Sequence, residues 1–390
     1  MQGNYRRLTW LQPPRYVPQV RTRLQLLLSL AVISTSLATP HAQPQAPERE
    51  GDFVIPSYQL RSGASLADVR LHYRTIGTPM RDARGKIRNG VLVMHGSSGD
   101  ASQVLAPSMR EPLVGPGRAL DPSKYFLIFP DILGAGKSTK PSDGLRAGFP
   151  RYGYEDLVDL EYRLVTEHFG IERLRLVMGI SMGGMHTWLW GIRHPGMMDG
   201  LVPISSLPVK VDGRNLLWRR ILSNAIRTDP SWMDGNYVAQ PRGFLNIMPM
   251  FDMLVQSPTR LAERLTTYAQ ADNYVQEVVA ETLGEDDANN ILYRFEASFD
   301  YDPAADVGRI TAPLLAILFA DDELNPVELN VIDPLIKRVV NGRHVIVPSS
   351  PETEAHRTQV KASVWASHLA AFMDALPALP PVTAGSIPPR

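Results

Sequence analysis

The six residues Gly179–Gly184 (GISMGG) carry the clearest chemical signature in the sequence. They join the apolar run LRLVMGI, which predicts a strand, to SMGGMHTWLWGIRHP, which predicts a helix that ends at Pro195. In a G-x-S-x-G turn between a strand and a helix, the serine hydroxyl is held at the sheet edge, and small neighbours let the backbone turn without clashes. The position of the motif therefore predicts that Ser181 is a nucleophile rather than a helix-capping serine.

A serine nucleophile needs a base and an orienting carboxylate, which on this type of fold follow it in the order acid, then histidine. The predicted strand PLLAILFA ends at Asp321 and Asp322, and the predicted strand HVIVP precedes the loop SSPETEAHRT, which contains His356. We therefore predict His356 as the base. The spacing leaves Asp321 and Asp322 as alternatives for the acid.

Four other histidines fit the role of the base less well. His344 begins a strand at the opposite sheet edge, and His368 lies in the last predicted helix. His186 and His194 lie in or at the end of the helix that follows the nucleophile. We interpret all four as packing or surface residues.

Acyl transfer also needs two preorganised N–H donors for the developing oxyanion. One comes from the residue after the nucleophile, here Met182, and the other from a loop after an early strand. The segment VLVMHGSSGD supplies that loop, and we assign the second donor to the N–H of Ser97. The Ser98 hydroxyl could assist, while His95 and Ser98 could equally form hydrogen bonds within the loop and take no part in chemistry.

The segment Leu133–Thr139 (LGAGKST) ends like a phosphate-binding loop. Asp131 stands where the first glycine of that motif belongs, and Pro141 opposes the helix that should follow. An ATP site is therefore not predicted.

The composition excludes several classes of function. Lys and Arg number 40 against 40 Asp and Glu, so no long-range field favours nucleic acid or anionic lipid. The chain has no cysteine, which removes disulfides, thiolate chemistry and Cys-based zinc sites. The predicted partner is a small-molecule ester, no cofactor or metal is needed, and the oligomeric state is left open.

Residues 1–42 read as a signal peptide or leader. Leu24–Ala38 (LQLLLSLAVISTSLA) is an apolar stretch behind several arginines, and it is shorter than the roughly 20 residues that span a membrane. Cleavage after Ala38 or Ala42 would export the protein to the periplasm or medium, without stable membrane insertion. The alternative is an uncleaved anchor.

Apolar runs alternate with helical patterns along the rest of the chain, which predicts an α/β fold with a mostly parallel, doubly wound sheet. Strands are predicted at Phe53–Leu60, Val69–Ile76, Val91–His95, Tyr125–Pro130, Leu174–Ile180, Leu201–Ile204, Leu314–Phe319 and His344–Val347. Helices are predicted at Glu155–His168, Met182–His194, Pro326–Val339 and Val360–Met373.

A helical segment interrupts this alternation. We divide the chain into a core of residues 51–205 and 310–375, an inserted helical lid of residues 206–309, and a disordered tail of residues 376–390. Such a lid would cover the carboxyl ends of the strands, where open α/β sheets bind ligands. Its segment Met248–Leu254, with Trp218, Trp232 and Phe244, is predicted to line an adaptable apolar pocket or to form the lid's own core.

Several segments resemble homoserine O-acetyltransferase-like α/β-hydrolases, and the resemblance extends over most of the chain after the leader. They are HYRTIGTP, VLVMHGSSGD, YFLIFPDILGAGKST, FPRYGYEDLV, GISMGGMHTWLW, AIRTDPSWMDGNY and the D-x-L-x-P after the penultimate strand. The resemblance implies an α/β-hydrolase fold with a helical lid. It implies Ser181 as nucleophile, His356 as base, and Asp322 rather than Asp321 as acid.

Two departures from the resemblance concern the substrate. Family acetyltransferases usually carry Arg-Gln where this chain has Ser223-Asn224, and a Gly-His-acid sequence where it reads EAHRT. An exported enzyme would also lack acetyl-CoA. We therefore expect hydrolysis of a small ester, or of an amide or lactone, with acyl-CoA-dependent O-acyl transfer as the alternative. A non-catalytic binding protein is disfavoured because all three triad residue types occur in order.

Overall fold

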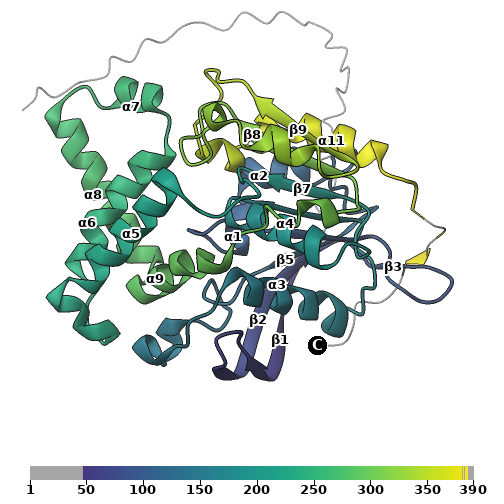
Figure 1. The fold of residues 1–390 in the computed structure, drawn as a ribbon, viewed down its shortest axis with the longest axis horizontal. Coiled ribbons are helices and arrows are strands. Elements are labelled where there is room, and N and C mark those ends of the chain that lie inside the picture. Colours follow the sequence, from purple (N-terminus) through teal and green to yellow (C-terminus); the bar gives the residue numbers. More distant parts are fainter. Residues whose placement is uncertain (1–46, 380, 382, 385–390) are drawn as a thin grey trace, which may run out of the picture. The chain divides into compact units, whose positions relative to one another are not determined.

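Eight strands form one sheet in the computed structural model, which describes residues 47–379, 381 and 383–384 (Figure 1). The strand order is β1-β2-β5-β4-β6-β7-β8-β9. The strands are β1 (Glu48–Gln59), β2 (Ser65–Ile76), β4 (Gly90–Met94), β5 (Phe126–Pro130), β6 (Leu176–Ile180), β7 (Leu201–Ile204), β8 (Leu314–Phe319) and β9 (Gly342–Val347). The predicted leader, residues 1–42, lies outside the described residues.

The central strands are parallel and fully buried, as their continuous apolar sequences predict. Strands β4 to β9 pair in parallel, and every residue of β4, β5, β6, β7 and β8 is buried. Strands β1 and β2 form an antiparallel hairpin, and β2 joins the sheet antiparallel to β5. The sheet is thus mostly parallel with an antiparallel edge, and the predicted fold class is confirmed.

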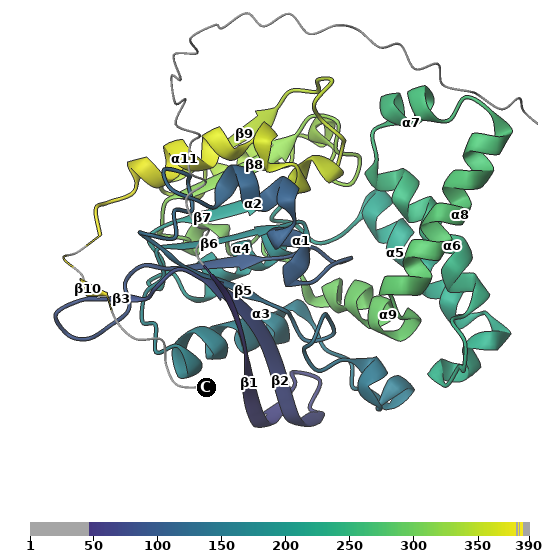
Figure 2. The same cartoon turned by 180° about the vertical axis from the view of Figure 1, so that it is seen from behind.

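Alternate residues of a strand face opposite helical layers, because side chains on a strand alternate in direction. In β4, Leu92 and Met94 join the core on one face, while Val91 and Val93 join the core on the other. The first core also contains side chains of α3 (Tyr154–Arg163) and α4 (Met182–Arg193). The second contains side chains of α1 (Ala101–Leu105), α2 (Pro107–Leu113) and α11 (Ala366–Ala375) (Figure 2).

The segment between β7 and β8 consists mainly of helices, which stand beside the sheet (Figure 1). They are α5 (Gly213–Arg227), α6 (Arg242–Val255), α7 (Pro258–Arg264), α8 (Tyr268–Glu285) and α9 (Ala288–Glu296). These helices have a core of their own, which includes Trp218, Leu222, Phe244 and Ile291. We call α5 to α9 the lid.

The lid ends earlier in the structure than the predicted boundary at residue 309. Ala297, Tyr301 and Val307 already belong to the main core beneath the sheet. The chain therefore leaves the lid at the end of α9, before the strand signal resumes.

The predicted helix Pro326–Val339 is broken in the structure. A short 3-10 turn covers Val327–Leu329, Asn330 has a left-handed backbone with φ 48°, and α10 covers only Ile332–Ile336. Pro334 has no N–H to donate to the carbonyl of Asn330, which explains the break. Helices α1 and α2, by contrast, were not predicted.

The predicted disordered tail is wrong for the residues that the structure describes. Leu376 is buried against Phe372, and β10 (Thr383–Ala384) pairs antiparallel with β3 (Met80–Arg81). The buried guanidinium of Arg175 donates hydrogen bonds to the carbonyls of Met373 and Pro377, at 3.3 and 2.6 Å. Apolar contact and these two bonds therefore fix the chain beyond α11.

Among the described residues, no helix combines the length and the apolar character that crossing a membrane requires.

Candidate active site

Ser181 stands at the sharp turn between β6 and α4. Its backbone has φ 50° and ψ −113°, a conformation that residues other than glycine rarely adopt. The Ser181 N–H donates to the carbonyl of Ile204 in β7 at 2.9 Å, which ties the turn to the neighbouring strand. Strained conformations of this kind persist only where the surrounding structure imposes them, and they cluster at functional sites.

The three glycines around Ser181 are required by close packing. A Cβ atom on Gly183 would lie 2.5 Å from the carbonyl oxygen of Met94, and one on Gly184 would lie 2.5 Å from Ser206 Oγ. A Cβ atom on Gly179 would overlap the backbone of Gly183. Helix α4 therefore approaches the sheet closer than any side chain would allow.

Ser181, His356 and Asp322 form a continuous hydrogen-bonded chain. His356 Nε2 lies 3.0 Å from Ser181 Oγ, and His356 Nδ1 lies 2.8 Å from Asp322 Oδ2. The three residues follow β6, β8 and β9, whose carboxyl ends meet at one edge of the sheet. His356 and Asp322 are 5% and 2% exposed, so water competes little for these bonds.

The surroundings of Asp322 favour its charged form. Burial on its own would raise the pKa of the Asp322 carboxyl group. Electrostatic attraction to the His356 ring, with hydrogen bonds from His356, from the Asn325 side chain and from the Leu324 N–H, outweighs burial and lowers the pKa of Asp322 below its ordinary value. Asp322 is thus an ionised acceptor for the imidazole N–H.

Asp321, the alternative acid, points elsewhere. Its Oδ2 accepts hydrogen bonds from Thr353 Oγ1 at 2.8 Å and from the Ala355 N–H at 3.1 Å. Asp321 therefore anchors the loop that carries His356, and the contact with the imidazole belongs to Asp322.

The two predicted oxyanion donors are free to bind a ligand. Among the hydrogen bonds of the described residues, neither the Ser97 N–H nor the Met182 N–H has an acceptor. Ser97 lines the same cavity as Ser181 and His356, and Met182 is the first residue of α4. A buried N–H at a helix start that has no partner is suited to an anionic oxygen.

His95 fixes the direction of the Ser97 N–H. His95 Nδ1 lies 2.8 Å from the carbonyl oxygen of Gly96 and must donate to it, while Nε2 accepts the Ile132 N–H at 3.3 Å. Burial lowers the pKa of His95, consistent with this neutral form. Because the C=O and N–H of a trans peptide point to opposite sides, holding the Gly96 carbonyl turns the Ser97 N–H away from His95. His95 thus forms a hydrogen bond within its own loop, as the sequence analysis allowed, and accepts a second one from Ile132.

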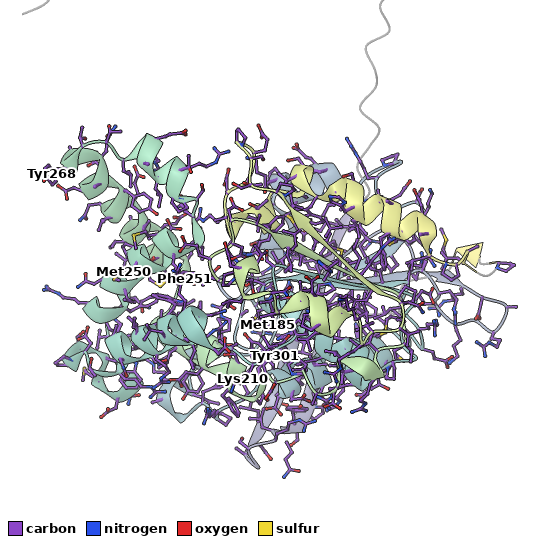
Figure 3. All side chains as sticks on the ribbon, turned by 45° about the horizontal axis from the view of Figure 1, so that its top comes forward. Met185, Lys210, Met250, Phe251, Tyr268 and Tyr301 are labelled. Carbon is purple, nitrogen blue, oxygen red and sulfur yellow. The ribbon has the colours of Figure 1, made fainter. Side chains whose placement is uncertain are left out.

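A cavity of about 340 Å³ lies over Ser181, between the sheet edge and the lid. Trp218, Met248 and Phe251 of the lid line it. Trp218 and Met248 also belong to the lid's own core, together with Trp232 and Phe244. Figure 3 labels Phe251 beside the half-exposed Met250 on α6. The lid residues therefore take both predicted roles, lining an apolar pocket and forming the lid's own core, and Trp218 and Met248 do both.

The cavity also contains charged residues that the sequence analysis did not assign. Arg357, next to His356, forms an ion pair with Asp252 of α6, and Asp252 also accepts from Tyr274 and Gln256. Arg219 lines the cavity as well. Arg357 lies in the sequence EAHRT, which differs from the family pattern. The signal for Arg219 is its spacing of four residues from Ser223, which places both side chains on one face of a helix.

His186, His194, His344 and His368, the other histidines considered as base, do not line this cavity. His186 Nδ1 bonds to Glu161 Oε1 at 2.7 Å, His194 stacks on Tyr162, and His344 Nε2 lies 3.3 Å from Asp333.

In the loop that resembles a phosphate-binding loop, Asp131 takes the place of an anion. Its two oxygens accept the N–H groups of Ala101 and Lys137, both at 2.8 Å. The loop's own carboxylate thus uses the Lys137 N–H, which a phosphate would otherwise need.

Comparison with known proteins identifies the family of this chain. The family model described as "alpha/beta hydrolase fold" matches residues 91–326. A homoserine O-acetyltransferase of Methanohalophilus mahii is 29% identical over 298 residues, covering 69% of this chain and 60% of the relative. A probable acyltransferase of Methanothermobacter thermautotrophicus is 28% identical, covering 76% and 90%. The chain thus spans less than two thirds of the first relative's length.

The fold also matches solved structures. The crystal structure of esterase E22 superimposes with a TM-score of 0.73 over 84% of this chain and 100% of that chain, at 19% identity. At this identity the likeness concerns the fold alone.

We predict that Gly183→Ala destabilises the protein by about 1–3 kcal/mol, because the added methyl group meets the Met94 carbonyl. Elsewhere in a helix the same change normally stabilises by about 0.5–1 kcal/mol, so the sign is diagnostic. The free energy of unfolding in urea measures it. Gly284→Ala in α8, with open space around the new methyl group, is the control. Equal stability of the two variants would contradict the packing argument.

We predict that Asp322→Asn slows labelling of Ser181 by a fluorophosphonate on the order of 10³-fold, because the imidazole loses its orienting carboxylate. Asp321→Asn, which touches the loop and not the imidazole, should slow it less than about tenfold. The labelling rate of each variant is measured at neutral pH. A larger effect at Asp321 would reverse the assignment.

Asp286, which also lines the cavity, should make stability depend on pH. Burial raises its pKa to about 6 from the ordinary 3.8. Between these values the folded chain binds more protons than the unfolded chain, so stability falls as pH rises from about 4 to 6.

Asp286→Asn should therefore raise the free energy of unfolding by about 1–3 kcal/mol at pH 7.5 and leave it unchanged at pH 4. Urea unfolding at both pH values is the measurement. Asp272→Asn, which removes an exposed carboxylate from α8, is the control. A gain at pH 4 equal to that at pH 7.5 would exclude titration of Asp286 as the cause.

Proposed function

This chain belongs to the alpha/beta hydrolase fold family, and on that premise we propose that it is a serine hydrolase that cleaves small esters through an acyl-enzyme on Ser181. The chain is similar to homoserine O-acetyltransferases. The proposal rests on one observation. Two hydrogen bonds connect Ser181 Oγ to His356 and His356 to Asp322, and Ser181 and His356 both line the cavity.

The geometry supports the following steps. His356 Nε2 accepts the Ser181 proton as Oγ attacks the ester carbonyl, and the charge of Asp322 stabilises the imidazolium. The N–H groups of Ser97 and Met182 bind the oxyanion of the tetrahedral intermediate. The imidazolium then protonates the departing alcohol. Water, deprotonated by the same imidazole, releases the acid from Ser181.

Two residues support water as the acyl acceptor. Arg357 stands where the acetyltransferases have an acid, and Ser223 stands where they have an arginine. Arg357 is already neutralised by Asp252, so neither position offers the charge that an amino-acid acceptor would meet in those enzymes.

Acyl transfer to an alcohol is the second candidate, and the names of the sequence relatives favour it over hydrolysis. One structural observation also favours it. Arg219 lines the cavity four residues before Ser223, so a guanidinium is present on the same helix face, although from a different position.

We also propose that the protein is exported, on the basis of the apolar stretch at Leu24–Ala38. Export would separate the enzyme from cytoplasmic acyl-CoA, which is a further reason to place water first.

The acceptor is tested with p-nitrophenyl acetate in the presence and absence of L-homoserine. We expect one acetate per p-nitrophenol with or without homoserine, and a loss of at least about 10³-fold in kcat/KM for Ser181→Ala. If O-acetylhomoserine forms instead of acetate, from this donor or from acetyl-CoA, acyl transfer is the function. If Ser181→Ala retains full activity, the acyl-enzyme proposal is wrong.

A further inference from the structure

A second cavity, of about 550 Å³, lies between the lid and the core. Helices α5 and α9 supply one side of it, and core residues such as Lys210 and Tyr301 supply the other (Figure 3). Arg219 and Phe295 line both cavities. Small-molecule sites often occur at such boundaries between structural units.

The lining of this cavity is strongly cationic in a chain whose formal net charge is zero. The cationic side chains are Arg151, Lys210, Arg219, Arg220 and Arg227, and the one carboxylate is Glu296. Glu296 lies 3.6 Å from Arg220 and 2.8 Å from Arg227. Among the described residues, Arg151, Lys210 and Arg219 form no ion pair with any carboxylate.

The floor of the cavity distinguishes it from an ordinary solvated cluster of charges. Arg219 is only 6% exposed, and its hydrogen bonds go to neutral acceptors, Asn215 Oδ1 at 3.0 Å and the Phe295 carbonyl at 2.9 Å. Ser223, one helical turn later, is 1% exposed, and its hydroxyl has no hydrogen-bond partner in the described structure. Buried polar groups are nearly always satisfied, so this pair is suited to a ligand's acceptor atoms.

The rim adds charge and one aromatic face. The guanidinium of Arg151 lies 3.8 Å from the centre of the Phe299 ring, which is 55% exposed. Lys210, which is exposed, extends from the core. Guanidinium forks, an ammonium group and a hydroxyl are the donors that bind phosphate oxygens in proteins. Three cations without carboxylates favour a group with more than one negative charge over a single carboxylate.

We propose that this cavity binds the diphosphate group of a small organic phosphate. Arg219 and Ser223 bind it at the floor, and Arg151 and Lys210 bind it at the rim. The site adjoins the cavity over Ser181 and shares Arg219 and Phe295 with it, but it does not depend on whether water or an alcohol accepts the acyl group.

The proposal is tested by calorimetric titration of inorganic pyrophosphate into the Ser181→Ala protein at about 150 mM NaCl. Using this variant separates binding from catalysis, so a failure here leaves the proposed function untouched. We expect one pyrophosphate per chain. Lys210→Ala, an exposed change that should not disturb folding, and Arg219→Gln should each weaken binding by at least about tenfold. Arg242→Gln, which removes a cation from the lid outside the cavity, is the matched control.

Further arms define the ligand class. ADP should bind at least as tightly as pyrophosphate, while sulfate and adenosine should bind at least about tenfold more weakly. Absence of pyrophosphate and ADP binding, equal affinity for sulfate, or wild-type affinity in both Lys210→Ala and Arg219→Gln would overturn the proposal.

Discussion

The close approach of α4 to the sheet is the constraint on which the rest of the site depends. Gly183 lies so near β4 that its N–H donates to the carbonyl of His95 at 3.1 Å. This bond joins the start of α4 to the loop that contains Ser97. Ser181, the proposed nucleophile, and the two proposed N–H donors therefore belong to one rigid unit, whose geometry is set by backbone packing before any substrate arrives.

The lid is bonded to both loops that complete the site. Arg357 and Asp252 connect the His356 loop to α6, and Arg260 of α7 donates to the carbonyl of Thr353 at 3.2 Å. Arg294 of α9 donates to the carbonyl of Gly99 at 2.8 Å, at the end of the loop that contains Ser97. Lid packing and the positions of the loops that carry Ser97 and His356 are thus energetically linked through charge-assisted hydrogen bonds, of which only that of Arg294 comes from a buried side chain.

The sequence predicts features that depend on local pattern. Buried parallel strands are continuous apolar runs, and the turn at Ser181 needs glycines at fixed positions, so both are readable in advance. Spacing alone could not decide between the adjacent Asp321 and Asp322. The resemblance favours Asp322, and the structure engages Asp321 with Thr353 and Ala355 instead of His356. The cationic cavity could not be predicted either, because Arg151, Lys210 and Ser223 are distant in sequence and meet only after the lid packs on the core.

The two hydrogen bonds from Arg175 to the chain beyond α11 have a consequence for biosynthesis. Ribosomes deliver Ser97 and Ser181 long before His356, and the carbonyls of Met373 and Pro377 follow later still. Until then, Ser181 lacks its hydrogen-bond partner His356, and the guanidinium of Arg175 lacks these two acceptors. The hydrogen bond between Ser181 and His356 and the completion of the core therefore both wait until these later segments have been synthesised.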